Sequence, residues 1–152
     1  MGERFEEKQA EAGGDAGLAE LKLALSCRPH HCRPGYLFTL RVTNVGDDPV
    51  CVRFPTSQQF DIIVQSAEGA PLWSWSADRA FLQMVSDREL LPGESAVYEV
   101  YWDGRLTDGS RFAGGRYRAT AHFLGQTVGH VPPATVELVV GDRRFAAGEQ
   151  LL

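Results

Sequence analysis

Alternating apolar and polar residues run through most of the chain. In the clearest stretches large apolar residues occupy every second position: Leu21, Leu23 and Leu25; Tyr36, Phe38, Leu40 and Val42; and Tyr117, Ala119, Ala121 and Phe123. A period of two residues is typical of a β-strand that turns one face to a core and the other to water. These stretches therefore predict β-strands.

The same alternation predicts further strands along the chain. They lie at residues 50–54, 60–64, around the tryptophans at 73 and 75, and at 96–102 and 134–140. Turn-forming sequences separate them, such as Leu91-Pro92-Gly93-Glu94. We expect one helical turn over residues 77–84, with Ser76 as its N-cap. Many short strands without a long helix are typical of an antiparallel sandwich or barrel.

One local pattern favours the immunoglobulin-like form of sandwich. Gly115-Arg116-Tyr117-Arg118-Ala119 has the form of a tyrosine corner, in which a Tyr at the start of a strand bonds back to nearby backbone. Ala119 stands where antibody domains place a cysteine, so we expect no disulfide between the sheets. The predicted fold is all-β, an immunoglobulin-like antiparallel β-sandwich of about 7–9 strands.

A chain of 152 residues suits one domain. We assign the sandwich to residues 18–142. Residues 1–17 are rich in Glu, Ala and Gly, and we expect them to form a disordered N-terminal tail. Residues 143–152 show no convincing period and are interpreted as a C-terminal tail.

Charge and composition narrow the range of partners. The net charge of −5 argues against nucleic acid or an anionic membrane as the main partner. No apolar run approaches the roughly 20 residues that a membrane span needs, and the charged N-terminus lacks the apolar region of a signal peptide. Three cysteines leave at least one thiol unpaired within the chain. These features predict a cytoplasmic protein.

Several short motifs in a fixed order carry a family resemblance. They are Phe54-Pro55-Thr56-Ser57-Gln58-Gln59-Phe60-Asp61, Trp73-Ser74-Trp75-Ser76, Phe81-Leu82-Gln83, Leu91-Pro92-Gly93-Glu94, Tyr101-Trp102 and Gly114-Gly115-Arg116-Tyr117. Over about residues 20–140 the chain resembles the BsuPI-type intracellular proteinase inhibitor domain. The resemblance implies an immunoglobulin-like β-sandwich, which agrees with the alternation, and inhibition of an intracellular serine protease. It assigns no inhibitory residue to a position in this chain.

An inhibitor presents a rigid exposed loop that enters a protease cleft as an extended strand, because a preordered loop binds at less entropic cost. Two predicted loops are candidates. Residues 26–35 contain two Arg-Pro pairs, and proline stiffens a loop by fixing φ. Residues 103–115 contain four glycines, which predict flexibility. The alternative for both is an ordinary surface connection. The candidate partner-binding residues are Arg28, Arg33, Arg105 and Arg111.

Two other groups of residues have a functional and a structural interpretation. Trp73 and Trp75 could form an aromatic platform for a peptide or a sugar, or they could belong to the core, which the bulk of the side chains favours. The polar residues beside the apolar strands could bind a ligand or bond to backbone groups at turns, and we favour the second role. These polar residues are Gln58, Gln59, Asp61 and Gln83.

Cys27-Arg28-Pro29-His30-His31-Cys32 places four possible metal donors within six residues. Zinc accepts thiolate and imidazole ligands. Zinc sites usually draw pairs of ligands from two separate segments, and the sequence has no second cluster. We therefore predict no metal and no other cofactor. A plain turn or a disulfide between Cys27 and Cys32 remains as the alternative.

Motifs for catalysis are missing from the sequence. Gly93-Glu94-Ser95-Ala96-Val97 lacks the second glycine of a nucleophile elbow, and neither a phosphate-binding loop nor a His-Glu-x-x-His motif occurs. We therefore expect a protein without enzymatic activity that binds another protein. The favoured function is an inhibitor or regulator of an intracellular serine protease of the subtilisin type. The alternatives are a general protein-interaction or assembly module and a carbohydrate-binding module, and nothing in the sequence decides the oligomeric state.

Overall fold

The computed structural model describes residues 19–140, so both predicted tails lie outside the described residues. Within this range the chain forms nine strands and one short 3-10 helix. In chain order they are β1 (Leu21–Pro29), β2 (Tyr36–Asn44), β3 (Val50–Phe54), β4 (Phe60–Ser66), β5 (Pro71–Ser74), η2 (Trp75–Asp78), β6 (Ser86–Leu90), β7 (Ser95–Trp102), β8 (Gly115–Phe123) and β9 (Ala134–Val140).

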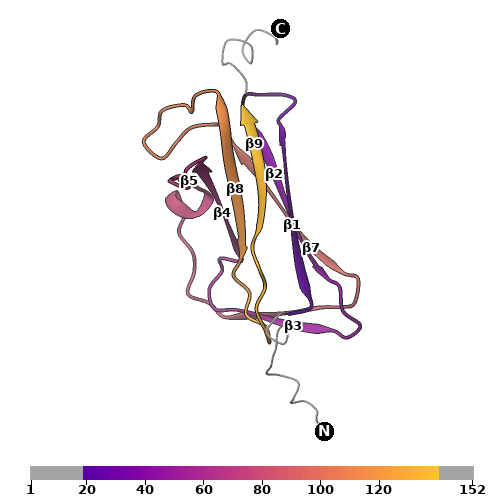
Figure 1. The fold of residues 1–152 in the computed structure, drawn as a ribbon. Coiled ribbons are helices and arrows are strands. Elements are labelled where there is room, and N and C mark those ends of the chain that lie inside the picture. Colours follow the sequence, from indigo (N-terminus) through magenta and orange to yellow (C-terminus); the bar gives the residue numbers. More distant parts are fainter. Residues whose placement is uncertain (1–18, 141–152) are drawn as a thin grey trace.

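The strands form three antiparallel sheets. One has the order β1-β2-β7, the second has the order β5-β4-β8-β9, and β3 pairs with β6 in the third. The first two sheets are the layers of the sandwich, and β3 lies across one end of it (Figure 1). The first and last strands, β1 and β9, contact each other. The predicted immunoglobulin-like β-sandwich is confirmed.

The core consists of the residues that the period of two singles out. Both layers supply fully buried side chains: Phe38, Leu40 and Val42 of β2, Ile62 and Val64 of β4, and Ala119 and Ala121 of β8. Their neighbours along each strand are more exposed. Burial of these apolar side chains is the main favourable term in folding, at about 25 cal/mol per Å² removed from water.

Trp102 joins the two layers through aromatic contacts. It is the largest fully buried side chain among the described residues. Its ring stacks on Phe38 of β2 at 6.2 Å between centroids and on Trp73 of β5 at 5.1 Å. The indole N–H donates to the carbonyl of Arg105 at 2.8 Å. A buried Trp needs such an acceptor for its polar edge. Trp73 is partly buried and packs against the core, as its bulk suggested.

The tyrosine corner predicted at the start of β8 is present. The hydroxyl of Tyr117 donates to the carbonyl of Ala113 at 2.7 Å, four residues upstream. Ala119 lies fully buried two positions further on. This bond fixes the entry of the chain into β8 and supports the immunoglobulin-like assignment.

The predicted helical turn is displaced. Helix η2 begins at Trp75 and ends at Asp78, before most of the predicted range 77–84. Ser76 is not the N-cap, a position that Ser74 occupies. Instead the Ser76 hydroxyl donates to Asp61 Oδ2 at 2.7 Å and its N–H donates to Oδ1 at 3.1 Å. Asp61, fifteen residues away, therefore holds the turn in place.

Strand β6 was not predicted, because its sequence lacks the signal that marks the other strands. Only Leu90 is buried in it, and the four residues before Leu90 are exposed. The strand forms by pairing with β3, from Phe54 opposite Ser86 to Val50 opposite Leu90. Backbone pairing rather than an apolar face defines this strand.

Asn44 is the one fully buried polar residue in the described range, and it connects three segments. Its Nδ2 donates to the carbonyls of Asp48 at 2.8 Å and Leu90 at 2.9 Å, and its Oδ1 accepts the N–H of Gly46 at 2.9 Å. Its own carbonyl accepts the N–H of Gly93 at 2.8 Å. Gly93 has φ of 82°, which favours glycine in this turn.

We predict that Asn44→Ala lowers the free energy of unfolding by about 2–4 kcal/mol, because hydrogen bonds are lost and the buried Leu90 carbonyl loses its donor. Urea denaturation would measure the loss. Asn44→Asp keeps an acceptor for Gly46 and removes both donors, so it should destabilise to a similar extent. Wild-type stability in the alanine variant would contradict this role.

Candidate functional site

The two loops predicted as candidates meet at one end of the sandwich. The β1–β2 loop and the long β7–β8 connection lie at the end where β9 finishes (Figure 1). A groove of about 700 Å³ is lined by residues 27–36, 103–104, 111–112 and 137–140. Segments that are far apart in the sequence therefore form one surface feature, which we call the loop-end groove.

Three of the four candidate arginines line the loop-end groove. They are Arg28 and Arg33 from the first loop and Arg111 from the second. Arg105 is not among the lining residues. All four side chains are exposed. Two acidic residues, Asp103 and Glu137, also line the groove, so its charge is mixed with an excess of positive groups.

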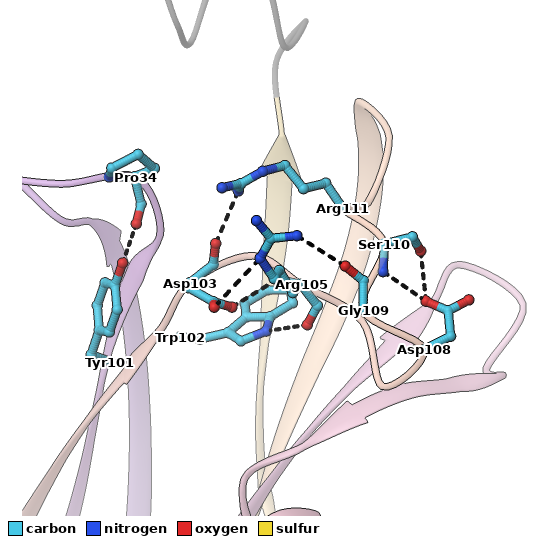
Figure 2. Close-up of polar contacts among 9 residues, drawn as sticks. All are labelled: Pro34, Tyr101, Trp102, Asp103, Arg105, Asp108, Gly109, Ser110 and Arg111. Atoms are coloured by element: carbon cyan, nitrogen blue, oxygen red, sulfur yellow. Dashed lines mark hydrogen bonds and ion pairs between the residues drawn. The ribbon is translucent and has the colours of Figure 1, made fainter.

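Two of the arginines hold their own loop together (Figure 2). Arg105 donates from Nη1 to the carbonyl of Gly109 at 3.0 Å, and its Nε lies 3.9 Å from Asp103 Oδ2. Arg111 donates from Nη1 to the carbonyl of Asp103 at 3.1 Å. Arg105 and Arg111 also form an antiparallel backbone bridge. The sequence predicts a flexible loop, but the structure shows one closed on itself.

The tip and the base of this loop have further contacts. At the tip, Asp108 Oδ1 accepts the Ser110 hydroxyl at 2.6 Å and the Ser110 N–H at 2.9 Å, bonds that lower the pKa of the carboxyl (Figure 2). At the base, the ring of Phe112 is buried and lies 4.7 Å from Trp102 and 4.6 Å from Tyr117. The loop is therefore anchored in the core.

The β1–β2 loop is fixed against the end of β7. The Tyr101 hydroxyl donates to the carbonyl of Pro34, as Figure 2 shows, and the guanidinium of Arg33 lies 3.9 Å from the centre of the Tyr101 ring. Gly35 has φ of 124°, and a Cβ on it would collide with the Trp102 carbonyl. These contacts order the loop without a disulfide.

Of the four possible metal donors in residues 27–32, the structure brings only three together. The possible ligand atoms of His30, His31 and Cys32 lie within 4.8 Å of one another, and Cys27 is not part of the group. The alternative of a Cys27–Cys32 disulfide is wrong, because both thiols are free. Partial burial and the nearby charge of Arg33 lower the pKa of His30. The same positive charge would oppose a bound cation, and the expectation of no metal stays a prediction.

Trp73 and Trp75 are packed on other aromatic rings and do not form the alternative, an exposed platform. Trp75 stacks on Phe60 at 4.2 Å between centroids, and the guanidinium of Arg79 lies 4.6 Å from the centre of a Trp75 ring. Trp73 stacks on Phe38 and Trp102. Both tryptophans pack against the core, as the structural interpretation predicted.

The polar residues beside the strands bond mostly within the fold. The Gln58 amide donates to the carbonyl of Phe60 at 3.1 Å, and Gln59 Oε1 accepts the Tyr98 hydroxyl at 2.6 Å. Asp61 holds the helical turn, as described above. Gln83 differs from these three, because it is exposed in a segment with neither helix nor strand.

That exposed segment is a feature that the sequence pattern did not single out. Residues 79–85 connect η2 to β6, and the side chains of Leu82, Met84 and Val85 are 65%, 56% and 59% exposed. Period-two alternation indicates buried faces, so it gives no signal for apolar residues that face water. The signal that could have identified the segment is the presence of three large apolar residues within the four positions 82–85.

The architecture is that of an immunoglobulin-like β-sandwich with ordered loops at one end. The family model for BsuPI, the intracellular proteinase inhibitor, matches residues 22–128. The chain therefore belongs to the BsuPI family. The matched range lies inside the described sandwich and includes both the first candidate loop and the 79–85 segment.

Other comparisons add little to this assignment. No curated protein matches the sequence. A crystal structure of the ApaA protein from Bordetella pertussis is similar over 84% of this chain and 97% of that chain, with 18% identity and a TM-score of 0.43. Among the described residues, no helix is long and apolar enough to cross a membrane.

The three thiols should differ in reactivity. Burial raises the pKa of Cys27 to about 12, whereas Cys32 and Cys51 are exposed. At pH 8 a thiol with that pKa has roughly 1,000-fold less thiolate than an unperturbed one. We expect iodoacetamide to modify Cys32 and Cys51 and to spare Cys27, as read by peptide mass spectrometry. Unfolding in urea should equalise the three rates, and equal rates in the native protein would contradict the assignment.

Proposed function

We propose that this protein inhibits a cytoplasmic serine protease of the subtilisin type by binding to it, without catalysis of its own. The observation that carries the proposal is the BsuPI family match over residues 22–128, nearly the whole described fold. The family description gives a proteinase as the target, and the choice of a serine protease of this type is our proposal.

The order of the exposed loops supports an inhibitory role. Both loops at the loop-end groove are tied down, one by Tyr101 and the other by Phe112. Protease–inhibitor complexes bury about 800 Å² on each partner and form with little backbone movement. A loop that is ordered before binding loses less entropy in the complex. The sandwich thus supplies the rigid support that an inhibitor requires.

Arg28 and Arg33 are the arginines that we propose as partner contacts in the loop-end groove. Arg105 and Arg111 donate hydrogen bonds to backbone carbonyls of their own loop. For Arg28, the described residues offer no ion pair. Its charge is therefore available for an acidic group on a protease, where it would mainly speed association.

The function is tested by mixing the purified protein with a panel of intracellular subtilisin-type proteases. We expect proteolysis of a protein substrate to fall to a low residual rate near equimolar inhibitor, with a complex visible by gel filtration. A metalloprotease serves as the control, because the added protein would also slow that enzyme if it acted only as a competing substrate. Undiminished proteolysis at high excess across the panel would overturn the proposal and favour a general assembly module.

The arginine contacts are tested by charge reversal. We expect Arg28→Glu combined with Arg33→Glu to slow association with the inhibited protease by about 10-fold at low salt, with a smaller effect at high salt. The matched control is Arg41→Glu combined with Arg118→Glu, which changes the net charge equally at exposed sites on the strands. Equal rates for both double variants in stopped-flow measurements would show that the loop-end arginines are not contacts.

A further inference from the structure

Residues 79–85 form an extended exposed segment, which we call the 79–85 segment. It leaves the helical turn η2 at Arg79, whose φ of −120° and ψ of 149° are extended. None of its seven residues belongs to a helix, strand, turn or bend. A fully extended chain of seven residues spans roughly 20 Å at about 3.3 Å per residue. In Figure 1 the chain that follows the coiled ribbon runs along the outside of the sandwich toward the end where β3 lies.

The 79–85 segment concentrates the exposed apolar side chains of the described range. Leu82, Met84 and Val85 are each more than half exposed. The other large apolar residues at the surface are spread along the chain, such as Val45, Val97 and Val128. Scattered apolar residues are normal at a protein surface, but a contiguous group marks an interaction site.

The first half of the segment is clamped to the 55–59 loop. The Leu82 N–H donates to Ser57 Oγ at 2.8 Å, and the Leu82 carbonyl accepts the Ser57 N–H at 2.9 Å. The ring of Phe81 packs on Trp75 at 5.7 Å between centroids. The backbone groups of Leu82 are therefore occupied and fixed in position.

The other end is held by the start of β6. Ser86 pairs with Phe54, and Asp87 pairs with Arg53 in the antiparallel register of β3 and β6. The Arg53 guanidinium donates to both carboxylate oxygens of Asp87, at 2.9 and 3.2 Å. Such a two-point bond fixes orientation as well as distance. The segment is thus stretched between two attachments rather than free at one end.

Between these attachments the backbone is open. Within residues 19–140, no hydrogen bond involves the backbone groups of Gln83, Met84 or Val85. A protein that adds a strand to a bound segment uses such unpaired N–H and C=O groups for affinity and places alternate side chains in pockets. The segment offers both features. Three successive residues have unpaired backbone N–H and C=O groups, and Met84 at their centre has an apolar side chain that is not branched at Cβ.

We propose that the 79–85 segment is the substrate-like strand that enters the protease cleft, with Met84 in an apolar specificity pocket. The inference rests on the proposed function and names the segment that enters the cleft, whereas Arg28 and Arg33 of the loop-end groove are proposed as charged contacts that speed association. Met84 is chosen because its flexible side chain fits a deep slot, whereas Val85 is branched at Cβ. The peptide bond between Met84 and Val85 then faces the nucleophile. The partner is a serine protease that cleaves after apolar residues.

The first test is Met84→Asp, which places a charge in the apolar pocket. We expect the inhibition constant to rise by about 100-fold or more, because central apolar anchors dominate such interfaces. The matched control is Val128→Asp, since Val128 is 96% exposed and lies elsewhere in the chain. It should inhibit like the wild type. Thermal unfolding of both variants checks that the fold is kept.

A gain of function provides the second test. The specificity pocket of trypsin has an aspartate at its base and accepts Arg or Lys. We expect Met84→Arg to inhibit trypsin at least 10-fold more strongly than the wild type does, and to lose inhibition of proteases with apolar pockets. This variant reports on the segment even before the natural target is known.

The clamp is tested with Ser57→Ala, which removes the oxygen that accepts the Leu82 N–H. We expect the inhibited protease to hydrolyse the Met84–Val85 peptide bond faster in this variant, because its 79–85 segment is held less firmly. Water adds across the peptide bond and leaves a carboxylate on Met84 and an amine on Val85. Mass spectrometry would identify the two fragments, and they should form at least 10-fold faster than from the wild type.

The outcomes separate this inference from the proposed function. If the wild type inhibits a protease and Met84→Asp inhibits it equally well, the segment does not enter the cleft and the proposed function stands. If no protease is inhibited and Met84→Arg has no effect on trypsin, both are overturned. If Met84→Asp only disperses a dimer of this chain and leaves inhibition intact, the segment is a contact between copies and the inference fails.

Discussion

The burial of Trp102 between the two sheets is the contact on which the loop end of this domain depends. Its ring lies against Phe38 in one layer and Trp73 in the other, and its indole N–H bonds to Arg105 in the long loop. Phe112 closes the loop back onto the same ring. One side chain therefore couples the packing of the sandwich to the position of the loops. An ordered loop end follows from the core and needs no disulfide.

Most of the fold could be predicted from the sequence because each strand buries its apolar face and exposes its polar face to water. The alternation around Phe38, Ile62 and Ala119 marks buried positions, and all three are fully buried. The same logic could not find β6, where backbone pairing with β3 replaces an apolar face. The prediction also placed the helical turn too late in the sequence. The position of the turn depends on the hydrogen bonds from Ser76 to Asp61, which lies on a strand fifteen residues away.

The candidate site could be predicted only in part, since it depends on which distant segments meet. The residue pattern identified Arg28, Arg33 and Arg111, and the fold brings these three to one groove. It could not show that Arg105 donates to its own loop, because that bond depends on the local path of the backbone. The clamp between Ser57 and Leu82 joins residues twenty-five positions apart, and no periodicity records such a contact.

Residues 77–89 contribute little to the core, and this has a consequence for how the protein can change over generations. Between residues 77 and 89 only Phe81 is partly buried. Selection for folding therefore places weak demands on the identity of the side chains here, while the pairing of β3 with β6 keeps the path of the chain. New residues can accumulate in this stretch without loss of the sandwich. A lineage could in this way follow a drifting target while inheriting the same scaffold.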